Sequence, residues 1–337
     1  MRSVKKRYSM KSLTGVLVSA GAITAIPPVA SAATIAFYAP WDAQADSALQ
    51  RHADQIDILA PAWITVTGSN DRVRMTDATG SPASLGKLQR VRTVLPLVQN
   101  DVEGVWRGAD SAVMLASPAR RKILLGALEA DIVARKGSGM IFDLEELPSS
   151  AQADYVRLLA EARARFAARH WKIGVCIPAD SPEWNLAVYG QAADLVILMA
   201  YDEHWQTGAP GPIASPAWFS TTVKQAAAAV SADRLVIGLA SYGYDWPAHG
   251  AAKPISISAA RALAQRMGAT MMRDAPEAQP HFTYAVKGVQ HQVWFVDGQS
   301  NRAEAGLAKS LGVKNLGFWR LGTEDPALWD WFARTPQ

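Results

Sequence analysis

Apolar residues occur in eight short continuous runs along the chain, separated by polar and turn-forming stretches. Runs of this kind are typical of parallel strands that are covered on both faces. Helical apolar patterns lie between several of the runs, so the pattern predicts a (β/α)₈ TIM barrel, an α/β fold. The predicted strands are Ile35–Tyr38, Ile56–Val66, Thr93–Val98, Gly139–Glu145, Lys172–Pro178, Leu195–Tyr201, Leu235–Tyr242 and Asn315–Trp319.

Three of the intervening segments carry clear helix signals. The pair Ser117-Pro118 is a favourable start for one helix, and an apolar stripe from Tyr155 to Phe166 predicts another. A third helix is expected to end before Gly312. Residues 247–296 depart from the alternation of strands and helices, because they contain one helical pattern and two segments in which apolar and polar residues alternate. This stretch is too long for an ordinary loop, so we predict a small α+β insertion between strand seven and strand eight.

Candidate catalytic groups lie at the end of the fourth predicted strand. Asp143 and Glu145 are two residues apart, and side chains alternate along a strand, so both should point to the same side. Carboxylates at the end of a buried strand are costly unless they are paired or functional. The alternative to a catalytic role is that these carboxylates form a structural ion pair, for which Arg320 is the candidate partner. Glu146 is expected to face the other way.

Polar and aromatic residues also follow other strands at the end where the active sites of such barrels lie. The sixth strand ends in Met199-Ala200-Tyr201-Asp202, and Tyr242 and Trp319 end the seventh and eighth. Near the end of the first strand lie Tyr38 and Trp41. Three further tryptophans are open to either a packing or a cleft-lining role: Trp63, Trp205 and Trp246.

These strand ends together resemble glycoside hydrolase family 18, the chitinase-like family, over roughly residues 34–332. The family motif Asp-Gly-x-Asp-x-Asp-x-Glu aligns with Ser138 to Glu145, and Ser138 and Ile141 replace its first two aspartates. Met199-Ala200-Tyr201-Asp202 matches the Met-x-Tyr-Asp motif of the family. The segments Val293–Asp297 and Phe318–Gly322 are similar to the bacterial branch that includes spore-cortex glycosylases and glycosidase domains of polysaccharide synthases.

The resemblance implies substrate-assisted retaining hydrolysis of β-linked N-acetylhexosamine polymers, in which the substrate's own acetamido oxygen attacks the anomeric carbon. Glu145 would be the general acid and base, Asp143 would hold the acetamido N–H, and Tyr201 would donate a hydrogen bond to its oxygen. The residues that would bind substrate are Asp202, Trp319, Tyr38, Trp41 and Tyr242. Because Ile141 stands where the family has an aspartate, Asp143 should lack a like-charged neighbour there.

The first 32 residues resemble an export signal. Five basic residues precede an apolar stretch from Leu13 to Ile26, and Ala30-Ser31-Ala32 is a plausible cleavage pattern. We therefore predict a signal peptide over 1–32, a glycosidase barrel over 33–337, and a periplasmic or extracellular location. An uncleaved membrane anchor is the less favoured alternative. The remaining chain has 29 basic and 30 acidic residues, which gives no support to nucleic-acid binding.

The sequence also bears on cofactors and partners. The six histidines lack metal-binding spacing, Cys176 is the single cysteine, and nucleotide-binding motifs are absent, so no metal or cofactor is expected. The expected partner is a polysaccharide or oligosaccharide that contains N-acetylhexosamine, with polysaccharide synthesis or export machinery as a further candidate. The alternative function is that of a catalytically inactive, lectin-like barrel, which the altered positions 138 and 141 leave open.

Overall fold

The computed structural model describes residues 32–67, 72–75, 90–275 and 278–334. The predicted signal peptide lies outside these residues, apart from Ala32. No helix in the described ranges is both long and apolar enough to cross a membrane. The strands of the main sheet are β1 (Thr34–Tyr38), β2 (Ile58–Pro61), β3 (Ile64–Thr67), β4 (Arg72–Met75), β5 (Thr93–Val94), β6 (Leu97–Gln99), β9 (Gly139–Asp143), β10 (Lys172–Pro178), β11 (Leu195–Met199), β12 (Leu235–Ala240) and β17 (Asn315–Trp319).

The main sheet has the hydrogen-bonded order β4-β3-β6-β9-β10-β11-β12-β17-β1-β2-β5, in which β4 is an antiparallel addition to β3. From β3 to β5 this order closes into a ring of eight strand positions. β2 and β3 are consecutive halves of one predicted strand, interrupted at residues 62–63, and β5 and β6 are halves of the next, interrupted at residues 95–96. β2 pairs with β5 and β3 pairs with β6, both in parallel, so the two interrupted strands complete the ring. Pro96 at the second interruption cannot donate a ladder hydrogen bond. The predicted (β/α)₈ barrel is confirmed.

Two apolar layers hold the barrel together. Inward-facing side chains fill its interior, among them Ile35, Phe37, Ile141 and Cys176, while the alternate positions pack outward against the helices. Between β9 and β10 the backbones come unusually close. A Cβ atom on Gly139 would lie 2.0 Å from the backbone oxygen of Lys172, so only glycine fits at the start of β9.

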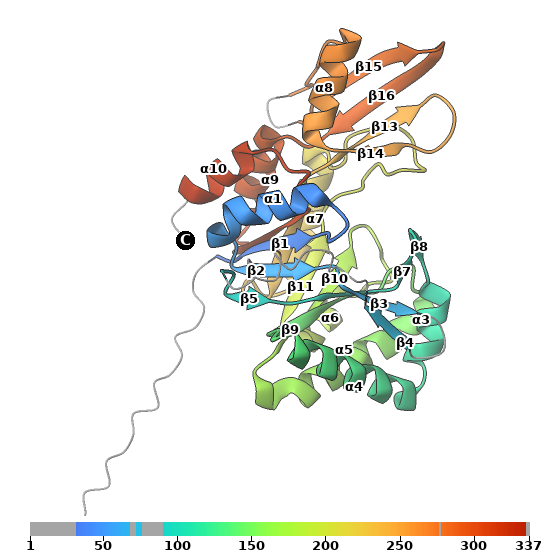
Figure 1. Ribbon diagram of the computed structural model, residues 1–337, viewed down its shortest axis with the longest axis vertical. Coiled ribbons are helices and arrows are strands. Elements are labelled where there is room, and N and C mark those ends of the chain that lie inside the picture. Colours follow the sequence, from blue (N-terminus) through green and yellow to red (C-terminus); the bar gives the residue numbers. More distant parts are fainter. Residues whose placement is uncertain (1–31, 68–71, 76–89, 276–277, 335–337) are drawn as a thin grey trace, which may run out of the picture. The chain divides into compact units, whose positions relative to one another are not determined.

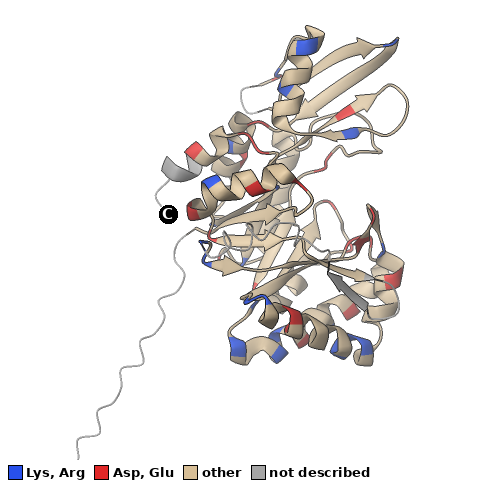
Figure 2. Ribbon diagram, viewed as in Figure 1, with Lys and Arg blue, Asp and Glu red and all other residues tan. Residues whose placement is uncertain are grey.

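Helices surround the ring, with α4 and α5 on its outer face (Figure 1). The predicted helix signals are confirmed: Ser117 caps α4, the stripe from Tyr155 to Phe166 is the buried face of α5, and Gly312 follows α9 with φ of 84°. Both basic residues (Lys or Arg) and acidic residues (Asp or Glu) lie on the helices around the barrel (Figure 2). These helices are α1 (Ala43–His52), α3 (Gly108–Leu115), α4 (Pro118–Ala134), α5 (Gln152–Phe166), α6 (Leu186–Ala192), α7 (Pro216–Ala229), α9 (Gly298–Ser310) and α10 (Ala327–Arg334), with short 3₁₀ turns η1 (Ala53–Gln55), η3 (Ser149–Ala151) and η4 (Ala167–Arg169).

The small α+β insertion predicted between strands seven and eight is also present. Its antiparallel sheet has the order β14-β13-β16-β15 and packs against α8 through an apolar cluster that includes Phe282, Val293 and Phe295. It begins at Gly243, slightly earlier than the sequence pattern indicates. Its elements are β13 (Gly243–Pro247), β14 (Lys253–Ile255), α8 (Ile257–Met267), β15 (His281–Val286) and β16 (Val289–Phe295). A further hairpin, β7 (Asp101–Val102) and β8 (Val105–Trp106), follows β6.

Candidate active site

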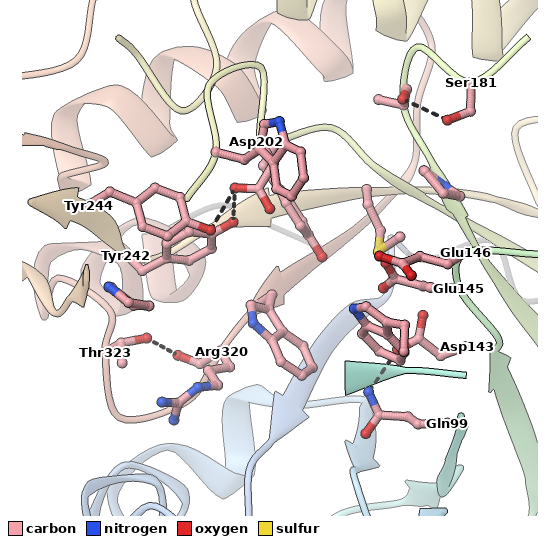
Figure 3. Close-up of a pocket in the computed structure, with 18 of the residues that line it drawn as sticks. Gln99, Asp143, Glu145, Glu146, Ser181, Asp202, Tyr242, Tyr244, Arg320 and Thr323 are labelled. Atoms are coloured by element: carbon pink, nitrogen blue, oxygen red, sulfur yellow. Dashed lines mark hydrogen bonds between the residues drawn. The ribbon is translucent and has the colours of Figure 1, made fainter. Parts of the chain in front are cut away.

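A cavity of about 850 Å³ lies at the carboxyl ends of the barrel strands (Figure 3). Residues at or beyond the ends of β6, β9, β10, β11, β12 and β17 contribute to its wall, and β14 of the insertion adds Pro254 and Ile255. Strands of a closed parallel barrel all end at the same rim, so residues far apart in sequence meet there. Six of the eight predicted site residues line this cavity: Asp143, Glu145, Tyr201, Asp202, Tyr242 and Trp319.

Asp143 is the last residue of β9 and is almost completely buried. Its Oδ2 accepts a hydrogen bond of 2.9 Å from Gln99 Nε2, and its Oδ1 is buried without a hydrogen-bond partner among the described residues. Ile141, two residues earlier, lies in the apolar barrel interior. Asp143 therefore has no carboxylate neighbour at the position where the family motif has one.

Burial raises the pKa values of both central carboxyl groups. The pKa of Asp143 is about 6, because burial outweighs the opposing effects of Gln99 and the nearby Cys176 thiol. The pKa of Glu145 is well above its ordinary value, first through burial and then through the negative charges of Asp143, Asp202 and Glu146. A protonated Glu145 beside a more acidic Asp143 gives the site one proton donor and one carboxylate near neutral pH.

Asn100 holds the backbone of Glu145 in place. Its Nδ2 donates to the Glu145 carbonyl oxygen and its Oδ1 accepts from the Glu145 N–H, both at 2.9 Å. Nδ2 also contacts Ser111 Oγ at 3.1 Å, and Asn100 itself is fully buried. Because β9 ends at Asp143, this side chain substitutes for the ladder hydrogen bonds that Glu145 lacks.

Asp202 lies on the opposite side of the cavity with two tyrosines (Figure 3). Its Oδ1 accepts hydrogen bonds from Tyr242 Oη at 2.6 Å and from Tyr244 Oη at 3.3 Å. The Asp202 side chain is exposed to the cavity, and desolvation by the surrounding wall raises its pKa to about 6 despite these two donors. Tyr242 thus reaches the cavity as predicted, and it fixes the Asp202 carboxylate.

Tyr201 and Trp319 complete the centre of the cavity. The Tyr201 ring packs edge-on against Tyr242, and its hydroxyl has no hydrogen-bond partner among the described residues, so it is available to a ligand. Trp319, at the end of β17, packs against Phe37 of the barrel interior with ring centroids 5.7 Å apart. An indole supported from below presents an apolar surface of the kind that the C–H face of a sugar ring prefers.

The structure does not bring Tyr38 and Trp41 to the cavity. Along β1, Ile35 and Phe37 point into the barrel, so Tyr38 points outward, where its hydroxyl donates to Asp46 of α1 at 2.6 Å. Trp41 is 61% exposed and does not line the cavity. Of the tryptophans whose role was open, Trp205 lines the cavity, whereas Trp63 and Trp246 are buried.

Two expectations about charged neighbours differ from the structure. Glu146 lines the cavity although strand alternation predicts that it faces away, because β9 has already ended and Glu146 has a left-handed φ of 52°. Arg320 pairs with Asp42, the N-cap residue of α1, and not with Asp143 or Glu145. The structural ion pair considered for the two central carboxylates is therefore absent from the described residues.

Sequence reasoning missed several residues of this site. Gln99 and Asn100 directly follow the third predicted strand, so the rule that strand ends carry the chemistry could have identified them. Tyr244 lies two residues after Tyr242 and thus on the same side of the chain. Trp106 and Trp184 also line the cavity, but they come from a hairpin and a loop that no strand pattern predicted.

Comparison with known proteins agrees with this geometry. The family model "Glycosyl hydrolases family 18" matches residues 33–324. A cortical fragment-lytic enzyme of Bacillus cereus is 28% identical over 255 residues, which cover 71% of this chain and 59% of the relative. The chain thus spans about half the length of the first curated relatives that it matches.

Solved structures show the same fold. The B. cereus spore cortex-lytic enzyme SleL has a TM-score of 0.81 at 22% identity, over 90% of this chain and 74% of that one. A chitinase from Chromobacterium violaceum has a TM-score of 0.80 at 24% identity, over 91% of this chain and 100% of that one. Because the family model covers most of the sequence, and the strand ends that it implies converge on one cavity, the chain belongs to the glycosyl hydrolases of family 18.

Proposed function

We propose that this glycoside hydrolase cleaves β-linked polysaccharides of N-acetylhexosamine with retention, through participation of the substrate's 2-acetamido group. The main supporting observation is the arrangement at the end of β9. Glu145 lines the cavity with its pKa raised, while the buried Asp143 has a free Oδ1 beside it. One group can thus supply a proton while the other accepts an N–H, as this mechanism requires.

The residues take distinct roles in the proposed reaction. The sugar ring lies on Trp319, and Glu145 protonates the leaving glycosidic oxygen while the acetamido oxygen attacks the anomeric carbon. Asp143 accepts the acetamido N–H and stabilises the positive charge of the cyclic intermediate, and Tyr201 donates its hydroxyl to the acetamido oxygen. Glu145 then removes a proton from the water that opens the intermediate, which restores the starting configuration.

A catalytically silent, glycan-binding barrel is the competing function. That alternative would be favoured by a Glu145 carboxyl that is tied up in an ion pair and inaccessible. Instead, Glu145 lines the cavity, and its side chain forms no ion pair within the described residues. The replacements at 138 and 141 leave both Asp143 and Glu145 in the site, so hydrolysis is the better-supported function.

The polymer and the location are also proposals. Some relatives of this chain are named as cortical fragment-lytic enzymes, and some structural neighbours as chitinases. We infer a substrate among bacterial exopolysaccharides, peptidoglycan glycan strands and chitin-like oligomers. With the signal peptide 1–32 removed, the enzyme would act in the periplasm or outside the cell, where polysaccharide synthesis or export machinery is a candidate partner.

The decisive experiment compares purified residues 33–337 with the Glu145→Gln variant. The substrates are a panel of N-acetylglucosamine oligomers, peptidoglycan fragments and bacterial exopolysaccharides, and the anomer released first is followed by NMR. We expect turnover by the native protein with initial release of the β-anomer, and loss of turnover by at least about 10²-fold in the variant. Binding without turnover by both proteins would instead support the glycan-binding alternative.

A further inference from the structure

Gln99 comes from a different strand than Asp143, yet the two are neighbours by register. β6 and β9 are parallel, and Gln99 is directly paired with Asp143. Paired residues of adjacent strands point to the same side of a sheet, so the amide group lies beside the carboxylate. Gln99 is only 8% exposed, and its Nε2 donates to Asp143 Oδ2 at 2.9 Å.

The other groups around Asp143 provide no positive charge. The titratable groups that interact electrostatically with it are Asp101 beyond β6, Glu145 beyond β9, Cys176 of β10, Tyr201 beyond β11 and Tyr155 of α5. Each is an acid, a phenol or a thiol, and no lysine or arginine is among these described neighbours. Gln99 and the Cys176 thiol both favour the ionised form of Asp143. Of the two, Gln99 makes the directed hydrogen bond of 2.9 Å, and its amide N–H is not an acid at ordinary pH.

We propose that Gln99 is a positioning residue for the proposed reaction, because its amide occupies Oδ2 of Asp143, keeps that carboxyl group ionised and turns the free Oδ1 toward the acetamido N–H. This inference rests on the proposed function. Ile141, the inward-facing residue before Asp143, is apolar and provides no polar partner. The neighbouring strand therefore supplies the polar contact that β9 itself lacks.

Two substitutions separate this role from simple packing. Gln99→Met keeps the length of the side chain but removes the donor, so Asp143 should hold its proton to higher pH. Gln99→Glu keeps a donor only while the new carboxyl group is protonated, so activity should persist in acid and decline earlier as the pH rises. Gln55→Met is the matched control, because Gln55 precedes β2 at the opposite end of the barrel and contacts His52 and the Trp329 carbonyl.

Two readouts are needed for each protein. The first is the pH dependence of kcat and KM on the oligomer that the native protein cleaves. The second is a ¹³C NMR titration of the Asp143 carboxyl carbon in aspartate-labelled protein without substrate, assigned with Asp143→Asn. In Gln99→Met, the Asp143 titration and the acidic limb of the rate profile should both move upward by about one to two pH units. At pH 7 kcat should fall roughly two- to tenfold, with a smaller effect on KM.

Failure of the role proposed for Gln99 and failure of the proposed function give different results in these two readouts. An unshifted Asp143 titration in folded Gln99→Met would overturn the role of Gln99 even if the enzyme is active. A shifted titration in a protein that hydrolyses no N-acetylhexosamine glycan would support the contact and reject the function. If Gln99→Met does not fold, Gln99→Glu gives the same decision, since a rate optimum unchanged from the native protein would overturn the proposal.

Discussion

Asp143 and Glu145 are two residues apart in the same rim, yet the proposed chemistry needs them in opposite protonation states. Asp143 must be a carboxylate to accept the acetamido N–H, and Glu145 must be an acid to protonate the leaving oxygen. Burial raises the pKa of both, but the pKa of Glu145 is raised further by the charge of Asp143. Because an ionised Asp143 raises the pKa of Glu145, the pair is expected to hold one proton near neutral pH, and the direction of the two shifts favours Glu145 as its holder.

A bell-shaped pH profile of kcat/KM follows. As the pH rises through about 6, Asp143 loses its proton and activity increases, and the same range covers Asp202, whose pKa is also about 6. At higher pH Glu145 loses its proton and activity falls. Steady-state rates between pH 4 and pH 9 test this expectation. An acidic limb near pH 4 would mean that Asp143 titrates as an ordinary exposed carboxyl group, contrary to its burial.

Between neighbouring strands, Asn100 links the end of β6 to the chain beyond β9. Its two hydrogen bonds to the Glu145 backbone should set the position from which the general acid acts. We expect Asn100→Ala to lower kcat by about 10- to 100-fold with little change in KM, since a small displacement of a catalytic group is costly. The free energy of unfolding should also fall by about 1–3 kcal/mol, because buried backbone groups lose their partners.

Ser117→Ala is a suitable control for that loss of stability. Ser117 Oγ caps α4 by accepting from the Arg120 N–H, so its removal should destabilise the protein by about 1 kcal/mol. Ser117 does not line the cavity, and kcat should remain at the native value. An equal fall of kcat in both variants would show that Asn100 acts through stability alone.

At the scale of strands and helices, the apolar pattern predicted the barrel because each buried strand is a continuous run. It could not predict the breaks at residues 62–63 and 95–96, which depend on the pairing of strands distant in sequence. The same limit applies to the site. Asp143, Glu145 and Tyr201 were identified at strand ends, whereas Tyr38 was assigned wrongly to the cavity because its strand presents Phe37 to the interior. Side-chain direction at a rim depends on where each strand stops.

For the whole molecule, a buried polar network joins the insertion to the barrel. Gln279 donates to Glu304 of α9 and accepts from the Ile213 N–H, while Asn301 donates to Glu304 and to the Ala240 carbonyl. Burial raises the pKa of Glu304 to about 8. In the unfolded chain Glu304 would ionise near its ordinary pKa of 4.5. The folded state therefore binds an extra proton between these values.

Stability should consequently decline as the pH rises from about 5 to 8, because the unfolded state releases the proton that the folded state retains. At pH 7 this effect lowers the free energy of unfolding by at most about 3 kcal/mol. Chemical denaturation of native protein and Glu304→Gln at several pH values tests this, with the exposed Glu103→Gln as control. Relative to the native protein, Glu304→Gln should gain stability as the pH rises. A difference between them that is constant with pH would contradict the assignment.

The charge of the cleft bears on which polymer the enzyme accepts. Six carboxyl groups line the cavity, from Asp42, Asp143, Glu145, Glu146, Glu183 and Asp202, and the one lysine or arginine among the described lining residues, Arg320, is paired with Asp42. Like charges in a cleft repel, so glycans rich in carboxylate groups should bind more weakly than neutral or partly de-N-acetylated ones. Binding of matched oligomers, measured calorimetrically to Glu145→Gln at low and high salt, tests this. The preference for neutral over anionic oligomers should become smaller at high salt and in the Glu183→Gln variant. Tighter binding of an anionic oligomer than of its neutral counterpart would contradict this prediction.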